Sequence, residues 1–292
     1  MKKILLVYNP VSGHAAFKRR LDEIIDACQR RGILLSMYRT RKNDWSDFGA
    51  CVKESRADGL ISAGGDGTLH AVVNAVMKFQ LDIPIGIIGS GTSNDFATHL
   101  GIGDLDKYLN AIADGRTRRV DLGVVNGREY FINVASAGML TSIAHEVNTR
   151  LKNSLGKMAY YLRAVREIPK FRSIAIKVDA DGIGFELDAF LFVVLNSSTV
   201  AGLRNVADFA LIDDGKLDFI AIKPCSPQRL MALTRDLFSG KGIIDEDAIF
   251  KLQSKRFYIS SKEKLMSDLD GEAGDALPIE IDTIPRAVEI FI

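Results

Sequence analysis

The residues with the clearest chemical meaning form a glycine-rich turn: Gly64, Gly65, Asp66, Gly67 and Thr68. Its three glycines leave backbone N–H groups uncovered, and a helix that starts there adds further N–H groups and the positive end of its dipole. Such a turn is typical of a phosphate site. Asp66 would repel the phosphate unless a divalent cation lay between them, so the turn predicts a magnesium nucleotide site. The alternative is a strand-to-helix turn whose glycines only allow the backbone conformation and bind no ligand.

The elements around this turn must form a parallel sheet. An apolar strand is predicted at 59–63, and a helix follows whose core-facing stripe has helical spacing: Leu69, Val72, Val73, Val76 and Met77. Two more polar, glycine-bearing turns follow predicted strands, at 9–13 after strand 3–8 and at 89–96 after strand 83–88. Because the carboxyl ends of parallel strands lie at one edge of a sheet, we expect the three turns to meet there.

Strands and helices alternate over the first part of the chain. A strand is predicted at 34–40, and helices at 17–28, 46–55 and about 104–115. Short alternating elements of this kind indicate right-handed crossovers and a doubly wound α/β layer.

From Arg119 onward the pattern changes to an antiparallel β domain. Strands are predicted at 120–125, 129–135, 174–178, 185–195, 216–222, 256–260, 279–281 and 287–292. Two helical segments interrupt them, at 142–169 and 227–237. We therefore predict an α/β domain at 1–121, joined by the last strand at 287–292, and a β-rich, sandwich-like domain at 122–286.

Composition narrows the class of protein. A chain of 292 residues with 47% hydrophobic residues can bury a large core, and a net charge of +1 argues against a nucleic-acid partner. Cys28, Cys51 and Cys225 are widely spaced in apolar surroundings and are expected to be reduced, which favours the cytoplasm. No apolar run approaches the roughly 20 residues that span a bilayer, so we expect any membrane contact to be peripheral.

Three motifs together resemble one family. These are Asn9, Pro10, Ser12 and Gly13, then 64–68, then Gly91, Thr92, Asn94, Asp95 and Phe96. Their combination is similar to the catalytic domain of the diacylglycerol kinase superfamily, and most similar to its bacterial lipid kinases. Later matches at 211–217 and 270–272 extend the resemblance over essentially the whole chain. The 64–68 turn alone would also fit NAD kinases.

The resemblance implies an ATP-dependent kinase that uses Mg²⁺. The residues implied for the nucleotide are Asn9, Pro10, Ser12, Gly13, Thr40, Gly64, Gly65, Asp66, Gly67, Thr68, Leu69, His70, Thr92, Asn94 and Asp95. Asp66, Asp95 and Asp121 would hold the catalytic magnesium through water. From the residues alone, Asp95 could instead be an N-cap and Asp121 part of a solvated turn. His70 is expected to be an exposed helix residue near the nucleotide.

The resemblance also implies roles for Glu272 and Asp270. Glu272 would accept the proton of the acceptor hydroxyl, and Asp270 would support it. The alternative is a polar hairpin turn, and the sequence does not separate the two carboxylates. A second, structural magnesium is implied at the carbonyls of Leu211 and Lys216 and the carboxylate of Asp214. The alternative there is a plain Asp-Gly turn.

A basic segment at 148–172 has the composition of a helix that can lie on an anionic membrane surface. It contains Arg150, Lys152, Lys157, Arg163, Arg166, Lys170 and Arg172 against one acid, with aromatic residues among them. The alternative is a solvated helix face. Open strand edges in the β domain also favour pairing of two copies.

The resulting hypothesis is a lipid kinase that phosphorylates a lipid alcohol, with diacylglycerol as the expected acceptor and phosphatidate as the product. One rival is an NAD kinase-like enzyme, which would need a polar acceptor cavity. The other is a non-catalytic nucleotide or lipid sensor, which predicts an incomplete carboxylate set.

Overall fold

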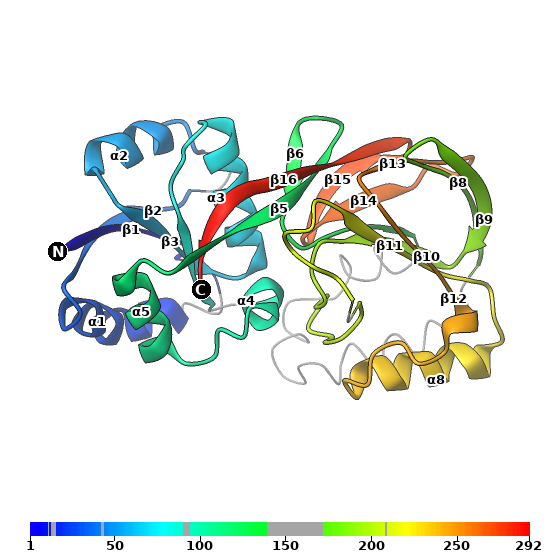
Figure 1. Cartoon of the computed structure of the whole chain (residues 1–292), viewed down its shortest axis with the longest axis horizontal. Coiled ribbons are helices and arrows are strands. Elements are labelled where there is room, and N and C mark those ends of the chain that lie inside the picture. Colours follow the sequence, from blue (N-terminus) through cyan, green and yellow to red (C-terminus); the bar gives the residue numbers. More distant parts are fainter. Residues whose placement is uncertain (11, 13–15, 42–43, 90–93, 139–171, 208) are drawn as a thin grey trace. The chain divides into compact units, whose positions relative to one another are not determined.

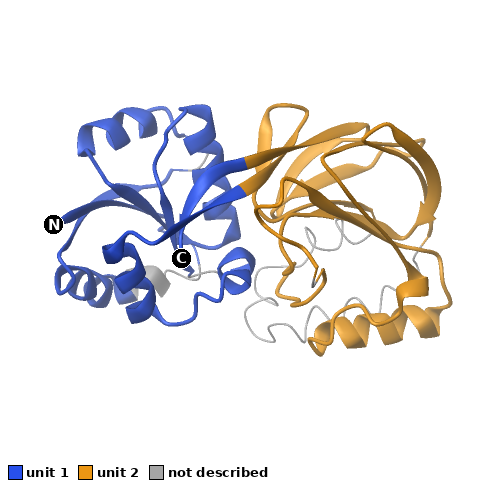
Figure 2. Ribbon diagram, in the orientation of Figure 1, with its two compact units in different colours: residues 1–120, 286–292 blue, residues 121–285 orange. Residues whose placement is uncertain are grey.

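The computed structural model describes residues 1–10, 12, 16–41, 44–89, 94–138, 172–207 and 209–292. The predicted site residues Gly13 and Thr92, the predicted helix at 142–169 and the basic segment except Arg172 lie outside these ranges. The chain divides into two compact units (Figure 2): unit 1 is Met1–Val120 with Arg286–Ile292, and unit 2 is Asp121–Pro285. It enters unit 2 within β5 (Thr117–Val125) and returns to unit 1 within β16 (Ile279–Phe291).

Unit 1 is built on a parallel sheet with the order β2-β1-β3-β4. Its strands are β1 (Lys2–Tyr8), β2 (Ile33–Arg39), β3 (Gly59–Gly64) and β4 (Ile85–Gly89). The end of β16 lies parallel to β4, with Ile290 paired to Ile85. The central strand β3 is buried throughout, and its neighbour β1 is buried from Ile4 to Val7. This burial is expected for parallel strands covered on both faces.

Helices cover both faces of this sheet (Figure 1). On one face, α1 (Ala16–Gln29) and α5 (Leu105–Asp114) pack Ile24, Leu109 and Ile112 into a core shared with β1 and β3. On the other, α2 (Phe48–Ser55) and α3 (Asp66–Lys78) pack together. A short helix, α4 (Asp95–His99), follows β4. The predicted doubly wound α/β layer is confirmed.

Unit 2 is an antiparallel β-sandwich. One sheet contains the first part of β16, then β13 (Arg256–Ser261), β8 (Ile174–Ala180) and β9 (Ile183–Ala189). The other has the order β12-β11-β10-β7-β14-β15. Its strands are β12 (Ile249–Ser254), β11 (Leu217–Ile222), β10 (Leu191–Leu195), β7 (Val134–Gly138), β14 (Met266–Leu269) and β15 (Glu272–Ala276).

One apolar core fills the sandwich, and a second lies on the outer face of the six-stranded sheet. Phe219 of β11 and Phe257 of β13 meet in the first core with their ring centroids 5.9 Å apart. Leu230 and Leu233 of α8 (Pro227–Phe238) pack into the second. The predicted β-rich domain is therefore confirmed. No helix in the described ranges has the length and apolar content needed to cross a bilayer.

Several strand predictions for unit 2 were wrong in detail. The single strand predicted at 185–195 is two strands, because the chain leaves one sheet after Ala189 and enters the other at Leu191. The strand predicted at 129–135 likewise divides into β6 (Glu129–Phe131) and β7. The last two predicted strands are one continuous strand, β16. β12, β14 and β15 were not predicted, because many of their residues are polar or small.

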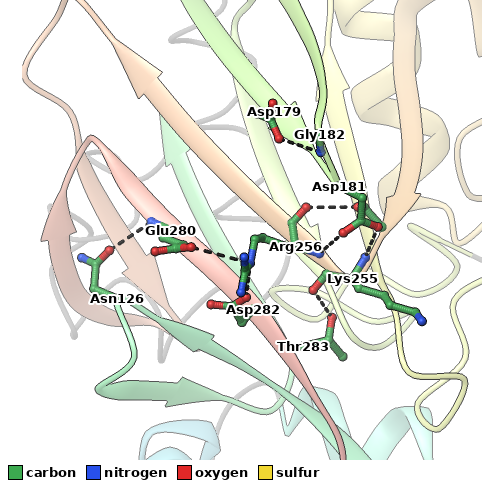
Figure 3. A network of polar contacts seen from close by, with 10 residues as sticks. Asn126, Asp179, Asp181, Gly182, Lys255, Arg256, Glu280, Asp282 and Thr283 are labelled. Carbon is green, nitrogen blue, oxygen red and sulfur yellow. Dashed lines mark hydrogen bonds and ion pairs between the residues drawn. The ribbon is translucent and has the colours of Figure 1, made fainter.

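Asp181 fixes the turn between β8 and β9 to the start of β13 (Figure 3). Its carboxylate accepts hydrogen bonds from the N–H groups of Lys255 at 3.0 Å and Arg256 at 3.1 Å. Asp181 and Gly182 have φ values of 52° and 87°, as a tight hairpin turn requires. Hydrogen bonds from the Ser254 hydroxyl and these backbone groups hold the pKa of Asp181 below its ordinary value.

We expect Asp181→Ala to lower the free energy of unfolding by about 1 kcal/mol, because two backbone donors lose a charged acceptor at an exposed position. The lowered pKa means that this stabilisation is present above the ordinary pKa of 3.8 and is lost as the pH falls through the folded-state value. Urea unfolding at pH 7 and at pH 3 measures both effects. Asp188→Ala, which removes an exposed carboxylate from β9, is the control. Equal stability of the two variants at pH 7 would contradict this role for Asp181.

Candidate functional site

The glycine-rich turn after β3 is bonded to the turn that follows β1. A Cβ added to Gly64 would lie 2.2 Å from Thr68 Oγ1 and 2.4 Å from Thr68 Cβ, so the position has room only for glycine. Thr68 Oγ1 accepts a hydrogen bond from Asn9 Nδ2 at 3.3 Å. Gly65 is the N-cap of α3 and brings no capping side chain. No side chain therefore caps the backbone N–H groups in the first turn of α3, a helix of 13 residues. Uncapped N–H groups at the start of a helix suit an anion.

Asp66 links the turn after β3 to the turn after β4. Its Oδ1 accepts the backbone N–H of Asp95 at 2.7 Å. Asp95 is buried at the first position of α4, and Asn94, with φ 49°, is the N-cap. The N-cap alternative for Asp95 is therefore excluded. A Cβ at Gly89 would lie 2.7 Å from Asn94 Cγ, so a larger residue there would have to displace the Asn94 side chain. Together with the Asn9–Thr68 bond, this places the turns of three parallel strands at one sheet edge, as expected.

Thr40 and Ser12 border the same edge. The Thr40 N–H donates to the Tyr8 carbonyl at 3.0 Å, which holds the end of β2 beside the end of β1. The Ser12 N–H donates to the Asn9 carbonyl at 3.3 Å and closes the turn around the buried Pro10. Backbone hydrogen bonds thus hold Tyr8, Asn9 and Ser12 at this edge.

The expectation that His70 is exposed was wrong. His70 is 7% exposed, like its buried neighbour Leu69 at 2%. The first turns of α3 are buried on most sides of the helix, so His70 does not lie on an exposed polar face. Asn74 Nδ2 donates to the His70 carbonyl at 2.9 Å and lies 3.3 Å from His70 Nε2. These contacts tie the imidazole to its own helix.

In unit 2, Asp270 and Glu272 differ sharply in environment. The Asp270 carboxylate is 8% exposed and accepts three backbone N–H groups, from Ile132, Asn133 and Val134, each at 2.9 Å. Asp270 and Gly271 have φ values of 54° and 94° and form the hairpin turn between β14 and β15. Glu272 is exposed, and its carboxylate has no hydrogen bond to any described residue. Asp270 therefore anchors the hairpin, and Glu272 projects from it.

Asn196, which is not among the predicted site residues, connects this anchor to Asp121. Asn196 is fully buried, and its Nδ2 donates to the Asp121 carbonyl at 2.8 Å and to the Ile132 carbonyl at 2.9 Å. The N–H of the same Ile132 donates to Asp270. The signal that could have identified it is an asparagine directly after the apolar strand 191–195. Buried amides of this kind are found where they fix backbone positions.

We expect Asn196→Ala to lower the free energy of unfolding by about 2–4 kcal/mol, because two buried carbonyls lose their shared donor. Chemical denaturation monitored by circular dichroism measures the change. Asn205→Ala is the matched control, since Asn205 is exposed and its Nδ2 donates to one carbonyl, that of Gly240. A loss no larger than that of the control would contradict the role of Asn196.

Asp121 lies behind the 212–215 loop. It is fully buried, which excludes the solvated-turn alternative. Its Oδ2 accepts the Gly215 N–H at 2.6 Å, and its own N–H donates to the Ile212 carbonyl at 2.6 Å. Asp214 is exposed, and its Oδ1 accepts the Lys216 N–H at 3.0 Å. Leu211 is also exposed. The structure thus gives the Asp121 carboxylate a partner within unit 2.

Neither predicted cation site is a ready-made cluster of side chains. Among the described residues, no three His, Cys, Asp or Glu side chains lie together as a metal-binding group. A cation at these places would draw its other ligands from backbone carbonyls, water or phosphate oxygens. This mixed set is the one that Mg²⁺ accepts, since it keeps several waters and takes few protein ligands.

Two family models match the chain. Residues 3–125 match the model described as the diacylglycerol kinase catalytic domain. Residues 133–292 match the YegS C-terminal NAD kinase beta sandwich-like domain. The first match contains the turns joined by Asn9, Asp66 and Asp95, and the second contains the Asp270–Glu272 hairpin.

Several known proteins are similar to this chain over nearly its whole length. A diacylglycerol kinase of Bacillus subtilis (strain 168) is 32% identical over 297 residues, covering 100% of this chain and 97% of the relative. One from Staphylococcus carnosus (strain TM300) is 32% identical, covering 99% and 95%. A crystal structure of a protein described as a diacylglycerol kinase, from Bacillus anthracis str. Sterne, matches with a TM-score of 0.83 at 26% identity, covering 99% and 95%. The chain therefore belongs to the diacylglycerol kinase family.

Proposed function

We propose that the protein is an ATP-dependent lipid kinase that transfers the γ-phosphate to the hydroxyl of diacylglycerol and forms phosphatidate. The observation that carries the proposal is the hydrogen bond from the Asp95 N–H to Asp66, which joins the two motif turns of the catalytic domain. The names of the relatives support the choice of acceptor.

We assign the nucleotide phosphates to the turns that carry Asn9, Gly64–Thr68 and Asn94. The donors there are backbone N–H groups and small polar side chains, which suit phosphate oxygens. Asp66 and Asp95 are the carboxylates next to this position, and with Asp121 they are the proposed ligands of Mg²⁺, mostly through water. The bound Mg²⁺ supplies positive charge that offsets the charge of the phosphates.

We assign the base to Glu272. Its carboxylate has no hydrogen bond to a described residue, so it is available to accept a proton, whereas the Asp270 carboxylate is taken up by three N–H donors. In the proposed step the acceptor oxygen bonds to the γ-phosphorus, the bond from this phosphorus to the bridging oxygen breaks, and ADP leaves. Glu272 accepts the hydroxyl proton as the new bond forms.

Transfer of label from γ-³²P ATP to a panel of acceptors tests the proposal. The panel in mixed micelles contains diacylglycerol, a sphingoid base, phosphatidylglycerol and NAD. The proposal predicts label in diacylglycerol. Label in NAD alone would favour the NAD kinase-like rival. This rival is included because the matching C-terminal family model is described as NAD kinase beta sandwich-like. ATP binding without label in any acceptor would favour the sensor.

Peripheral binding to an anionic membrane and pairing of two copies also stay proposals. Both follow from the sequence, and the basic segment lies outside the described residues apart from Arg172. Sedimentation with anionic and with neutral vesicles tests the first, and light scattering tests the second. The proposal expects more protein bound to the anionic vesicles and a molar mass of two chains.

A further inference from the structure

Glu272 begins a short strand that has little support from its own sheet. β15 is the end strand of the six-stranded sheet, and in the part of the chain that the structure describes its strand partner is β14 alone. The pairing is interrupted after Glu272, where residues 274 and 275 of β15 face the single residue Ser267 of β14. Such a bulge disrupts the ladder of hydrogen bonds and bends the strand. The strand that carries Glu272 therefore depends on contacts from outside the ladder.

Asp275 forms these contacts. Its carbonyl oxygen accepts the Ser267 hydroxyl at 2.7 Å, beside the bulge. Its carboxylate accepts Arg128 Nη2, at 2.5 Å and 2.6 Å from the two oxygens, and Asn126 Nδ2 at 2.6 Å. Hydrogen bonds from Arg128 and Asn126 hold the pKa of Asp275 below its ordinary value, so the carboxylate is charged at neutral pH. Donors from β14 and from the β5–β6 hairpin thus converge on one residue of β15.

The donors on the β5–β6 hairpin are themselves fixed in place. Asn126 and Gly127 have φ values of 50° and 66° and form a tight turn, which is the usual role of an Asn-Gly pair between two strands. Asn126 is also bonded to Glu280 of β16 (Figure 3): its N–H donates to the Glu280 carbonyl at 2.8 Å, and its Oδ1 accepts the Glu280 N–H at 3.0 Å. Asn126 therefore joins β16 of one sheet to β15 of the other.

The same segment of the chain also holds the other end of the β14–β15 hairpin. Residues 132–134 donate three N–H groups to Asp270, two residues before Glu272. Arg128 and Asn126 hold Asp275, three residues after Glu272. Glu272 thus lies between two anchors that both bond to residues 126–134. An exposed ion pair usually adds little to stability, so the importance of this one depends on its place beside Glu272.

We infer that Arg128 and Asp275 are a positioning pair, which holds β15 so that the Glu272 carboxylate has a fixed place during proton transfer. The inference rests on the proposed role of Glu272 as the base. Since the Glu272 carboxylate has no hydrogen bond to a described residue, its place depends on the backbone that carries it. A misplacement of about 1 Å can lower the rate of a reaction about 10²-fold.

Rates of phosphoryl transfer to diacylglycerol in mixed micelles test the inference. Asp275→Ala should lower kcat about 10-fold and leave the KM for ATP unchanged, because the turns assigned to the nucleotide belong to unit 1. Arg128→Met should cause a smaller loss, since Asn126 still holds the carboxylate, and the double variant should be no slower than Asp275→Ala. Lys177→Met, which removes the exposed ion pair with Glu186 from β8 and β9, is the matched control and should keep the wild-type rate.

The same change in a Glu272→Gln background separates positioning from a merely structural role. If the pair acts through Glu272, Asp275→Ala should cause no further loss once the base is absent. An equal loss in both backgrounds would overturn the inference, and so would an unchanged kcat of Asp275→Ala in the wild-type background. If Asp275→Ala does not fold, Arg128→Met provides the same comparison at an exposed side chain.

Amide hydrogen exchange tests the anchor without using activity. Asp275→Ala should make exchange at 272–276 about tenfold faster and leave exchange in β8 and β9 unchanged. Unchanged exchange at 272–276 would show that the pair does not hold β15 and would overturn the inference. The proposed function fails in a different way, with no phosphoryl transfer by the wild type although exchange at 272–276 still responds to Asp275→Ala. The inference would then fall with the function on which it rests.

Discussion

Glu272→Gln should lower the rate of phosphoryl transfer by about 10²- to 10⁴-fold, which is the usual contribution of a general base. The amide keeps the shape of the side chain but cannot accept the hydroxyl proton. Because Glu272 is exposed and its carboxylate has no hydrogen bond to a described residue, the melting temperature should stay within about 1 °C of the wild type. Initial rates at saturating ATP and acceptor, with thermal unfolding of the same samples, measure both effects.

Asp270→Asn is the matched comparison for this variant. Asp270 accepts three backbone N–H groups in a buried position, and an amide would place a donor where one of them now finds an acceptor. We expect a loss of about 2–3 kcal/mol in the free energy of unfolding, in addition to reduced activity. If Glu272→Gln kept its activity while Asp270→Asn lost activity at full stability, the roles of the two residues would be reversed.

Asp66→Asn should lower activity by about 10²- to 10³-fold and raise the Mg²⁺ concentration needed for half-maximal rate. The amide oxygen can still accept the Asp95 N–H, so the link between the two turns is retained and only the negative charge is removed. This design separates the proposed magnesium role from the structural one. A Mg²⁺ titration of the initial rate measures the change.

Asp66→Ala is the control for that link. It removes the acceptor as well as the charge, so it should also destabilise unit 1 by about 1–2 kcal/mol, whereas Asp66→Asn should not. Wild-type activity in Asp66→Asn together with a loss in Asp66→Ala would contradict the magnesium role. It would leave Asp66 as a residue that only holds the start of α4.

The sequence predicted unit 1 well because its signals are local. The apolar run of β1, the helical stripe of α3 and the glycine turns each specify an element within a few residues. The parallel arrangement of the strands then places these turns at one edge of the sheet, where Asn9 and Asp66 form the hydrogen bonds that join them. The expectation for His70 was wrong because the first turns of α3 are buried on more sides than the apolar stripe alone indicates.

Unit 2 was harder to predict because its determining contacts are distant in sequence. Asp270 is bonded to a segment 136–138 residues away, and the sequence alone could not separate it from Glu272. Asn196 bonds carbonyls 64 and 75 residues away, so its role becomes visible only in the fold. The polar composition of β14 and β15 gave no strand signal, although these strands carry the hairpin.

The measurement that tests the central claim most directly follows two labels into diacylglycerol. The protein is incubated with diacylglycerol in mixed micelles and Mg²⁺, with γ-³²P ATP in one sample and α-³²P ATP in the other, and the lipids are extracted. The account predicts labelled phosphatidate from the γ label alone, and about 10²- to 10⁴-fold slower labelling with Glu272→Gln. No labelled phosphatidate from a protein that binds ATP, or an unchanged rate with Glu272→Gln, would contradict it.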